Sequence, residues 1–282
     1  MSAETTTPIT PVREDAVTTP AGLQDKRVLA TRRAVMLALG LAVVAVLTAG
    51  IAAVFAPGGY SVADWLILGG FVVGTPWVVM GVLNSVLGLW LLHGARDGLA
   101  SAAPHLAAGE TDRPVSSRVA LAMTIRNEDP ERSLARLAAM RAELDATGQG
   151  DRFDIHVLSD TSDPEIAAAE ERLFAAMRPR LGGPHAHYRR RAENTGFKAG
   201  NIREFVENAG ARHDFFLPLD SDSLMDGETI LRMVRIMEAH PRLGIVQSLV
   251  VGAPADSAFA RIFQFGMRHG MRSYTMGAAW WQ

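Results

Sequence analysis

The chain has 282 residues, 48% of them hydrophobic, and a formal net charge of −2 at pH 7. A nearly neutral chain has no general attraction for polyanions, so its composition does not indicate a nucleic acid partner. The absence of cysteine excludes disulfides and thiolate metal sites and fits a reducing compartment.

The N-terminal third changes composition twice. Residues 1–33, rich in Thr and Pro at their start, predict a disordered leader. Two uncharged runs follow within residues 34–95, and each is long enough to cross a bilayer core of ~30 Å. They predict two transmembrane helices. A cleaved signal peptide is the alternative for the first run, which its length and its distance from the N-terminus disfavour.

After a predicted linker at residues 96–117, strand and helix patterns alternate. This alternation predicts a parallel sheet with right-handed crossovers. The predicted fold class is α/β, with a Rossmann-like, mostly parallel sheet in a domain at residues 118–282. The predicted strands lie at residues 119–125, 153–160, around 187–190, 214–220 and 243–251.

Polar residues follow three of these strands, at the edge where parallel sheets bind ligands. Asp129 precedes a proline, as Asp163 does further on, so both are predicted as helix N-caps. Asp160 fits a turn as well as a ligand contact, and Glu128 has no assigned role from its position alone. The set comprises Asn127, Glu128 and Asp129, then Asp160, then Asp220 and Asp222.

Asp220 and Asp222 stand one residue apart in the segment LPLDSDS. Like charges this close resist joint ionisation unless a cation or a set of donors lies between them. Mg²⁺ commonly pairs one or two carboxylates with substrate phosphates, so the pair suits a divalent cation. A turn is the alternative, because Asp and Ser both bond their own backbone.

A basic segment supplies the opposite charge. In NTGFKAGN, Lys198 lies between Gly196 and Gly200 at the predicted start of a helix, where backbone amides and an ammonium can bind a diphosphate. The preceding arginines, Arg189–Arg191, fit this site or a solvated surface equally. The chain lacks the glycine patterns of dinucleotide-binding and P-loop proteins.

The order of these motifs carries a resemblance. NEDP, VLSD, NTGFKAGN, LDSDS and MEAHPRLGIVQS follow one another as in the processive, inverting family 2 glycosyltransferases. The chain is most similar to the glucosyltransferase H branch, the membrane enzymes that make osmoregulated periplasmic glucans. The resemblance spans roughly residues 118–282 and implies a glycosyltransferase A fold, UDP-glucose as donor and a growing β-glucan as product.

The resemblance also implies roles for residues. Asp160 would contact the uracil of UDP-glucose, and Lys198 would lie near the diphosphate. Asp220 and Asp222 would hold the diphosphate through Mg²⁺ or Mn²⁺, and Glu128 belongs to the expected substrate site. Arg126 stands where the family usually has an aromatic residue.

No catalytic residue is predicted within the chain. Inverting transfer needs a general base, and the family's base carboxylate and Arg-Trp motif are expected beyond Gln282. We therefore expect a fragment that is inactive alone. The resemblance implies a bacterial, multi-pass inner-membrane protein with a cytoplasmic catalytic domain. Its expected partners are membrane lipid and an acyl carrier protein, besides donor and glucan.

Two other functions fit parts of the sequence. One is a membrane protein that binds UDP-sugars without catalysis, which the missing base would explain. The other is a haloacid dehalogenase type phosphatase, with Asp220 as nucleophile and Asp222 as acid. The position of this pair, about a hundred residues into the predicted domain, disfavours the phosphatase.

The placement of basic residues predicts the topology. The leader contains several Arg and Lys residues, residues 57–64 contain none, and Arg96 follows the second apolar run. By the positive-inside rule, Gly109 is then cytoplasmic and Gly59 periplasmic. Reporter fusions at these two sites test this, and the opposite pattern of reporter activity would refute it.

Overall fold

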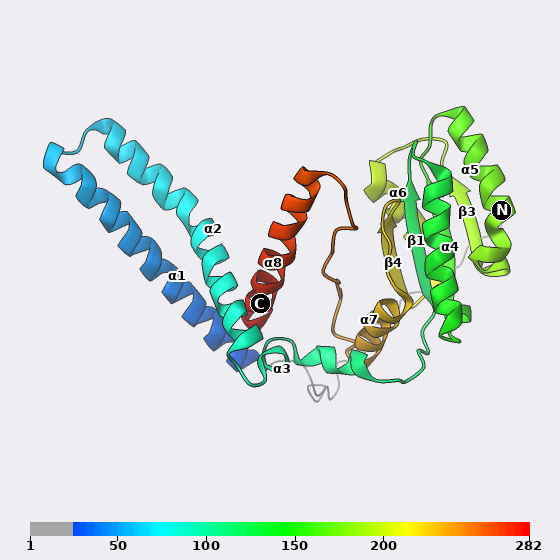
Figure 1. Cartoon of the computed structure of the whole chain (residues 1–282), viewed down its shortest axis with the longest axis horizontal. Coiled ribbons are helices and arrows are strands. Elements are labelled where there is room, and N and C mark those ends of the chain that lie inside the picture. The colour runs from blue at the N-terminus through cyan, green and yellow to red at the C-terminus, as the bar shows by residue number, and fades with distance from the viewer. Residues whose placement is uncertain (1–24) are drawn as a thin grey trace, which may run out of the picture. The chain divides into compact units, whose positions relative to one another are not determined.

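The computed structural model describes residues 25–282, so most of the predicted leader lies outside the described residues. The chain forms two compact units (Figure 1). A helical unit contains the described residues up to His105 together with Ala253–Gln282, and an α/β unit contains Leu106–Gly252. The predicted domain at 118–282 differs from this division, because its last helix packs with the N-terminal helices.

The helical unit is built around a long hairpin of α1 (Lys26–Phe55) and α2 (Val62–His93) (Figure 1). Both helices are long and apolar enough to cross a membrane, which confirms the two predicted apolar helices. Most of their apolar side chains are exposed, as lipid contact requires. The unit also contains α3 (Gly98–Ala102) and α8 (Ala258–Trp281).

Small residues let α8 approach α2 to backbone contact. A Cβ atom added at Gly88 would lie 1.7 Å from the carbonyl oxygen of Ser273, and one at Gly277 would lie 2.0 Å from that of Asn84. The indole of Trp281 donates a hydrogen bond of 2.8 Å to the Asn84 side chain. Such close packing is typical of helices that associate in lipid.

The α/β unit contains a four-stranded parallel sheet in the order β3-β2-β1-β4, as the α/β prediction requires. Its strands are β1 (Val119–Ile125), β2 (Phe153–Ser159), β3 (Ala186–Arg190) and β4 (Phe215–Asp220). Its main helices are α4 (Pro130–Ala146), α5 (Pro164–Met177), α6 (Phe197–Ala209) and α7 (Gly227–Ala239).

Helices cover both faces of this sheet. The chain moves outward from β1 to β3 and then returns to the other side of β1, so right-handed crossovers place α6 on the face opposite α4 and α5. The larger core joins residues such as Leu121 and Ile155 to α4 and α7. On the α6 face, Phe205 packs against Ala122 and Leu158.

The strand order reverses between β1 and β4, which is where such sheets bind ligands.

One predicted strand is wrong. Residues 243–251 form no strand, and Ile245, Val250 and Val251 are exposed. Residues with high strand propensity form a strand only where they can pack against neighbouring strands. No strand of the described chain pairs with this segment. The predicted linker also differs, since α3 and a 3₁₀ helix at Pro104–Glu110 occupy part of it.

The predicted N-caps are confirmed. Asp129 accepts hydrogen bonds from the amides at the start of α4, and Asp163 does the same for α5. Asp226 caps α7 through the amide of Thr229 at 2.7 Å. These three carboxylates therefore stabilise helix ends.

The contact between α2 and α8 gives a test of the helical unit. Gly277→Leu should lower the free energy of unfolding by about 1–3 kcal/mol, because the new side chain meets the α2 backbone. Reversible denaturation in mixed micelles measures this. Gly266→Leu in the same helix is the matched control, since a Cβ atom there meets nothing within 4 Å. Equal effects of the two substitutions would contradict this packing.

Candidate functional site

The strand ends bring most of the predicted site residues to one edge of the sheet. The register pairs Ile125 with Ser159 and Thr124 with Asp220, so β1, β2 and β4 end nearly level. The pairing continues past the strands, because the Asp160 amide donates to the Ile125 carbonyl at 2.9 Å. The Arg191 amide likewise donates to the Ser159 carbonyl at 3.0 Å. The backbone thus fixes Asp160 beside Arg191.

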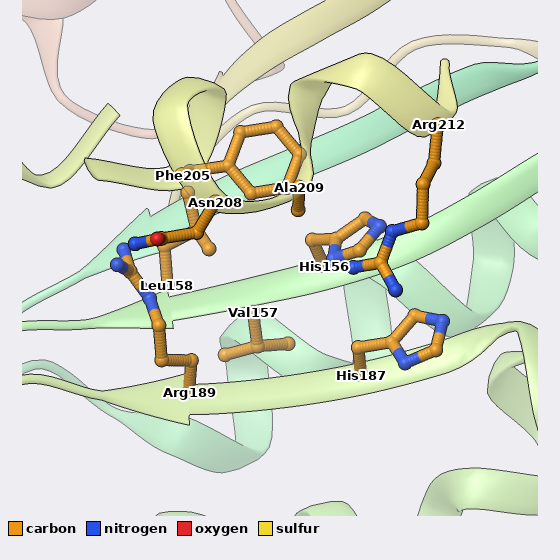
Figure 2. A pocket seen from close by; sticks show the side chains of 9 residues that line it. All are labelled: His156, Val157, Leu158, His187, Arg189, Phe205, Asn208, Ala209 and Arg212. Carbon is orange, nitrogen blue, oxygen red and sulfur yellow. The ribbon is translucent and has the colours of Figure 1, made fainter. Parts of the chain in front are cut away.

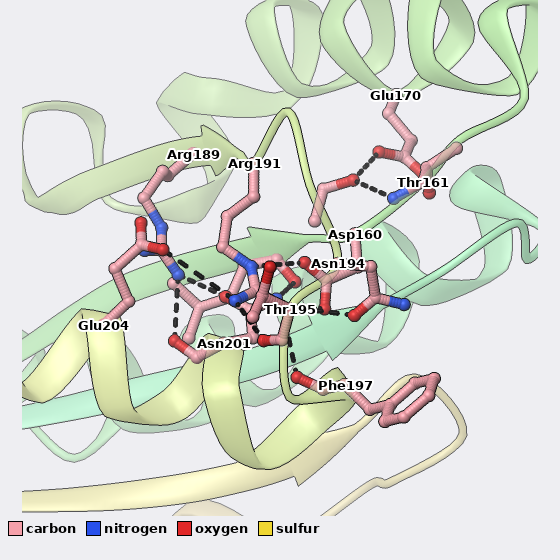
Figure 3. Close-up of polar contacts among 12 residues, drawn as sticks. Asp160, Thr161, Glu170, Arg189, Arg191, Asn194, Thr195, Phe197, Asn201 and Glu204 are labelled. Carbon is pink, nitrogen blue, oxygen red and sulfur yellow. Dashed lines mark hydrogen bonds and ion pairs between the residues drawn. The ribbon is translucent and has the colours of Figure 1, made fainter.

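Asp160 and Arg191 form a buried ion pair (Figure 3). The guanidinium donates to both carboxylate oxygens, at 2.7 and 2.8 Å. The Arg191 and Asp160 side chains are only 6% and 5% exposed. The hydrogen bonds to Asp160 raise the pKa of Arg191 despite its burial. The Asp160 carboxylate therefore has a fixed orientation, set by its two hydrogen bonds to one guanidinium.

Arg191 also shapes the loop that leads into α6. It donates to the backbone carbonyls of Thr195 and Phe197, each at 3.1 Å, and to the Asn194 side chain at 3.2 Å. Gly196 closes the loop with a φ of +71°, in the left-handed region that glycine favours. This loop delivers Lys198 to the sheet edge. Sequence reasoning left Arg191 open, because three consecutive arginines also fit a solvated surface.

Arg189 contacts a different part of the structure from Arg191. It pairs with Glu204 of α6 and donates to the side chain of Asn201. Asn201 is fully buried and donates to the Leu158 carbonyl at 3.1 Å. These contacts fasten the start of α6 to β2 and β3, so Arg189 and Arg191 are structural anchors and Arg190 alone is an ordinary surface residue.

A buried carboxylate that the sequence did not reveal supports the other side of this edge. Glu170 of α5 accepts hydrogen bonds from Ser159 at 2.7 Å and from Tyr188 at 2.9 Å. It also accepts one from Thr161, which lies beside it in Figure 3. Burial raises the pKa of the Tyr188 phenol, so it remains a donor. Glu170 lies in an Ala- and Glu-rich helix, where periodicity alone cannot distinguish it from solvated glutamates.

Lys198 and Asp220 meet at the end of β4, on the same edge of the sheet. The ammonium pairs directly with the Asp220 carboxylate, and the side chains are 49% and 62% exposed. Asp220 begins a turn, because the Ser223 amide donates to its carbonyl at 3.0 Å. Arg136 of α4 donates to the carbonyl of Ser221 at 2.9 Å and steadies this turn. The turn alternative is confirmed, and it presents Asp220 and Asp222 to solvent together.

The Asp220–Asp222 turn fits a cation that arrives with its phosphate. Among residues 25–282, no three His, Cys, Asp or Glu side chains are placed to hold a metal ion. Mg²⁺ needs six oxygen ligands, and two carboxylates leave most of them to phosphate and water. Two carboxylates alone could thus supply only part of the ligand set of a Mg²⁺ ion.

Asn127 and Glu128 share the loop after β1. Asn127 has a φ of +53°, and its side-chain oxygen accepts from the amides of Ser162 and Asp163, each at 3.0 Å. It thereby joins the loops after β1 and β2. Glu128 is exposed and has no hydrogen bond or ion pair within the described part of the chain, so its substrate role stays a prediction.

Comparison with known proteins identifies the family. The sequence profile of "Glycosyl transferase family 2" matches residues 121–277, which is more than half of the chain. The chain belongs to glycosyl transferase family 2. The match includes β1 to β4, the loop carrying Lys198 and the Asp220–Asp222 turn.

Curated relatives of this family 2 chain carry the name glucans biosynthesis glucosyltransferase H. The protein of Bradyrhizobium diazoefficiens is 39% identical over 227 residues, which cover 79% of this chain and 29% of the relative. The protein of Xanthomonas campestris is 39% identical over 229 residues, which cover 80% of this chain and 34% of the relative. The protein of Cereibacter sphaeroides is 42% identical over 194 residues, which cover 68% of this chain and 31% of the relative. The chain thus spans about a third of these relatives' length.

The Asp160–Arg191 pair makes a quantitative prediction. Arg191→Leu leaves a buried carboxylate without its partner, and should lower the free energy of unfolding by about 3–5 kcal/mol. Chemical denaturation in detergent measures the loss. Arg190→Leu is the matched control, because Arg190 is 41% exposed and its contact with Glu171 is long, at 3.5 Å. Losses of similar size in both variants would show that the buried pair has no special structural role.

Proposed function

We propose that this chain forms the donor-binding part of a membrane glucosyltransferase that uses UDP-glucose to build a periplasmic β-glucan backbone. The observation that carries the proposal is the meeting of Lys198 with the Asp220–Asp222 turn at the sheet edge. An ammonium and two carboxylates in one exposed place suit a diphosphate bound together with a cation. The names of the relatives support a glucosyl group and a glucan.

In this proposal the donor lies along the carboxyl edge. The uracil faces Asp160, whose carboxylate is oriented by Arg191 and keeps lone pairs for a further N–H donor. The diphosphate lies between Lys198 and the Asp220–Asp222 turn. Family 2 glycosyltransferases commonly use a divalent metal; here Mg²⁺ or Mn²⁺ would neutralise the leaving diphosphate. Glu128 lies in the loop nearest the β1 end and completes the proposed substrate site.

The direct pairing of Lys198 with Asp220 has a consequence for binding. The ammonium contacts the same carboxylate that is proposed to bind the cation. When a diphosphate binds, Lys198 exchanges this carboxylate for phosphate oxygens, and Asp220 becomes available to the cation. Because both side chains are half exposed, the exchange requires no unfolding of the sheet edge.

The remaining parts of the reaction are proposed for the whole protein. Transfer with inversion needs a base for the acceptor hydroxyl. Asp129, Asp163 and Asp226 cap helices and Asp160 forms an ion pair, while Glu128 and Asp222 are assigned here to the substrate side of the site. We propose that the base lies in sequence like that of the longer relatives. The two apolar helices fit a bacterial inner membrane with the α/β unit in the cytoplasm. Partnership with an acyl carrier protein is suggested by the family resemblance alone.

A UDP-sugar-binding protein without catalysis is the second candidate, favoured by the absence of an assigned base in the described residues. Binding of UDP-glucose without transfer by the full-length protein would establish it. The phosphatase alternative loses support, because the family match includes the Asp220–Asp222 turn.

Calorimetry with UDP tests the donor site. We expect UDP binding to the detergent-solubilised chain to require Mg²⁺ and to be lost in Asp222→Ala, because the cation joins this carboxylate to the diphosphate. Asp151→Ala is the control, since Asp151 is 95% exposed and lies at the opposite end of β2. Equal affinity in excess chelator would contradict the cation's role.

Binding of uridine tests the proposed base site independently of the diphosphate site. Asp160→Asn should weaken uridine binding even in chelator, while Asp222→Ala should leave it unchanged, because uridine has no phosphate for a cation to bridge. Uridine affinity that is unchanged in Asp160→Asn would exclude Asp160 from the base site. Circular dichroism of each variant verifies that the fold is intact.

A further inference from the structure

A second polar cluster lies on the α6 face of the sheet, toward the strand beginnings. Asp154 and His156 of β2 and His187 of β3 point to this face, because neighbouring residues along a strand alternate between faces. His156 is four positions from Asp160 along β2, or roughly 13 Å at ~3.3 Å per residue. The cluster is therefore separate from the proposed donor site.

Two adjoining cavities open among these residues, with volumes of 190 and 310 Å³. They share His156, His187 and Arg212, and together we call them the histidine pocket. The smaller cavity has an apolar wall that includes Leu158 and Phe205 (Figure 2). The larger one is lined by polar side chains, among them Arg118, Asp154, His185 and His213.

Asp154 is the one carboxylate lining the pocket, and its oxygens are already engaged. Arg118 donates to both of them, at 2.8 and 3.1 Å. His185 lies 2.7 Å from one oxygen and His213 lies 2.9 Å from the other. Burial opposes its ionisation, but these hydrogen bonds outweigh burial and hold the pKa of Asp154 below its usual range. Its charge is thus compensated locally.

Arg212 is left without a counter-ion. Arg118 pairs with Asp154 and Arg189 pairs with Glu204, whereas Arg212 has no hydrogen bond or ion pair among the described residues. Figure 2 shows its side chain reaching over the pocket toward His156 and His187. Its exposed guanidinium adds a positive charge to a pocket whose one carboxylate, Asp154, is already paired with Arg118.

His156 adds a buried ring nitrogen without a hydrogen-bond partner. It is 5% exposed, and its Nε2 atom has no hydrogen-bond partner. Burial, and then the positive field of His187 and His213, lower the pKa of His156 to about 3, so the ring is neutral. It stacks on His187 with ring centroids 4.7 Å apart. A buried polar atom without a protein partner has room for a hydrogen bond to a ligand group or a water molecule.

We propose that the histidine pocket binds a small organic phosphate. Its oxygens would pair with Arg212 and accept hydrogen bonds from the His156 and His187 rings, while its apolar part would lie against Phe205 and Leu158. This site is additional to the proposed donor site and uses none of its residues.

The arrangement favours phosphate over other ligands. Its donors approach from three elements, β2, β3 and the turn after α6, and a tetrahedral phosphate offers oxygens in three directions whereas a carboxylate offers two in a plane. A metal cation would be repelled by Arg212, and the Asp154 oxygens already accept hydrogen bonds. The apolar wall favours a ligand with a hydrocarbon or aromatic part.

NMR of the histidine rings tests this site directly. The detergent-solubilised full chain, labelled at histidine, is titrated with inorganic phosphate and with phenyl phosphate at low ionic strength. We expect saturable shifts of the His156 and His187 signals with both probes, and tighter binding of phenyl phosphate because of the apolar wall. Equal affinity for the two probes would overturn the organic part of the proposal, and absence of saturable shifts would overturn the site.

Variants assign the binding to the pocket. Arg212→Gln should weaken phenyl phosphate binding by at least about tenfold, because a charge-assisted contact is lost. Arg203→Gln is the matched control, since Arg203 lies on α6, just before the turn that carries Arg212, is 79% exposed and pairs with Glu207. Lys198→Ala should leave the histidine shifts unchanged, which separates this site from the donor site. If the midpoint of the phenyl phosphate titration were the same in Arg212→Gln as in the unchanged protein, the proposal would be contradicted.

Discussion

A buried ion pair between Asp160 and Arg191 fixes the carboxyl edge of the sheet. Removing two charges from water is unfavourable unless each is fully hydrogen-bonded, and here Arg191 satisfies both Asp160 oxygens and the loop before α6. The ends of β2 and β3 and the start of α6 are therefore held by one guanidinium. The position of Lys198 follows from this anchor.

The exposed pair of Lys198 and Asp220 has the opposite character. A solvent-exposed ion pair contributes only about 0–1 kcal/mol to stability, so its partners can separate when a ligand offers better ones. The edge thus combines a rigid, buried charge pair with an adjustable, exposed one. Under the proposed function, this division suits a site that orients a nucleotide sugar and then releases UDP as one leaving group.

Local sequence signals predicted the helices and strands that depend mainly on neighbouring residues. The proline after Asp129 marked a helix start, and the apolar runs of β1, β2 and β4 marked strands, because capping and burial depend on nearby residues. The segment at 243–251 has strand composition but lacks a paired neighbour. Strand formation there depends on tertiary contacts that a single sequence does not display.

The candidate site was predictable to the same extent. Lys198, Asp220 and Asp222 were found through their glycines and their spacing, and the structure brings Lys198 to Asp220. Arg191 and Glu170 could not be singled out, since an arginine run and a glutamate-rich helix both fit solvent exposure. Their partners lie 31 and 11 residues away in the chain, and only folding brings them together.

Hydrogen–deuterium exchange with UDP and Mg²⁺ tests most directly whether the carboxyl edge binds the nucleotide. Bound ligand should slow exchange in peptides covering residues 126–129, 160–163, 194–199 and 220–224, because these loops form one edge of the sheet. Peptides at the strand beginnings, residues 153–156 and 186–187, should keep their rates. Protection confined to the strand beginnings, or none at any of the four loops, would contradict the account.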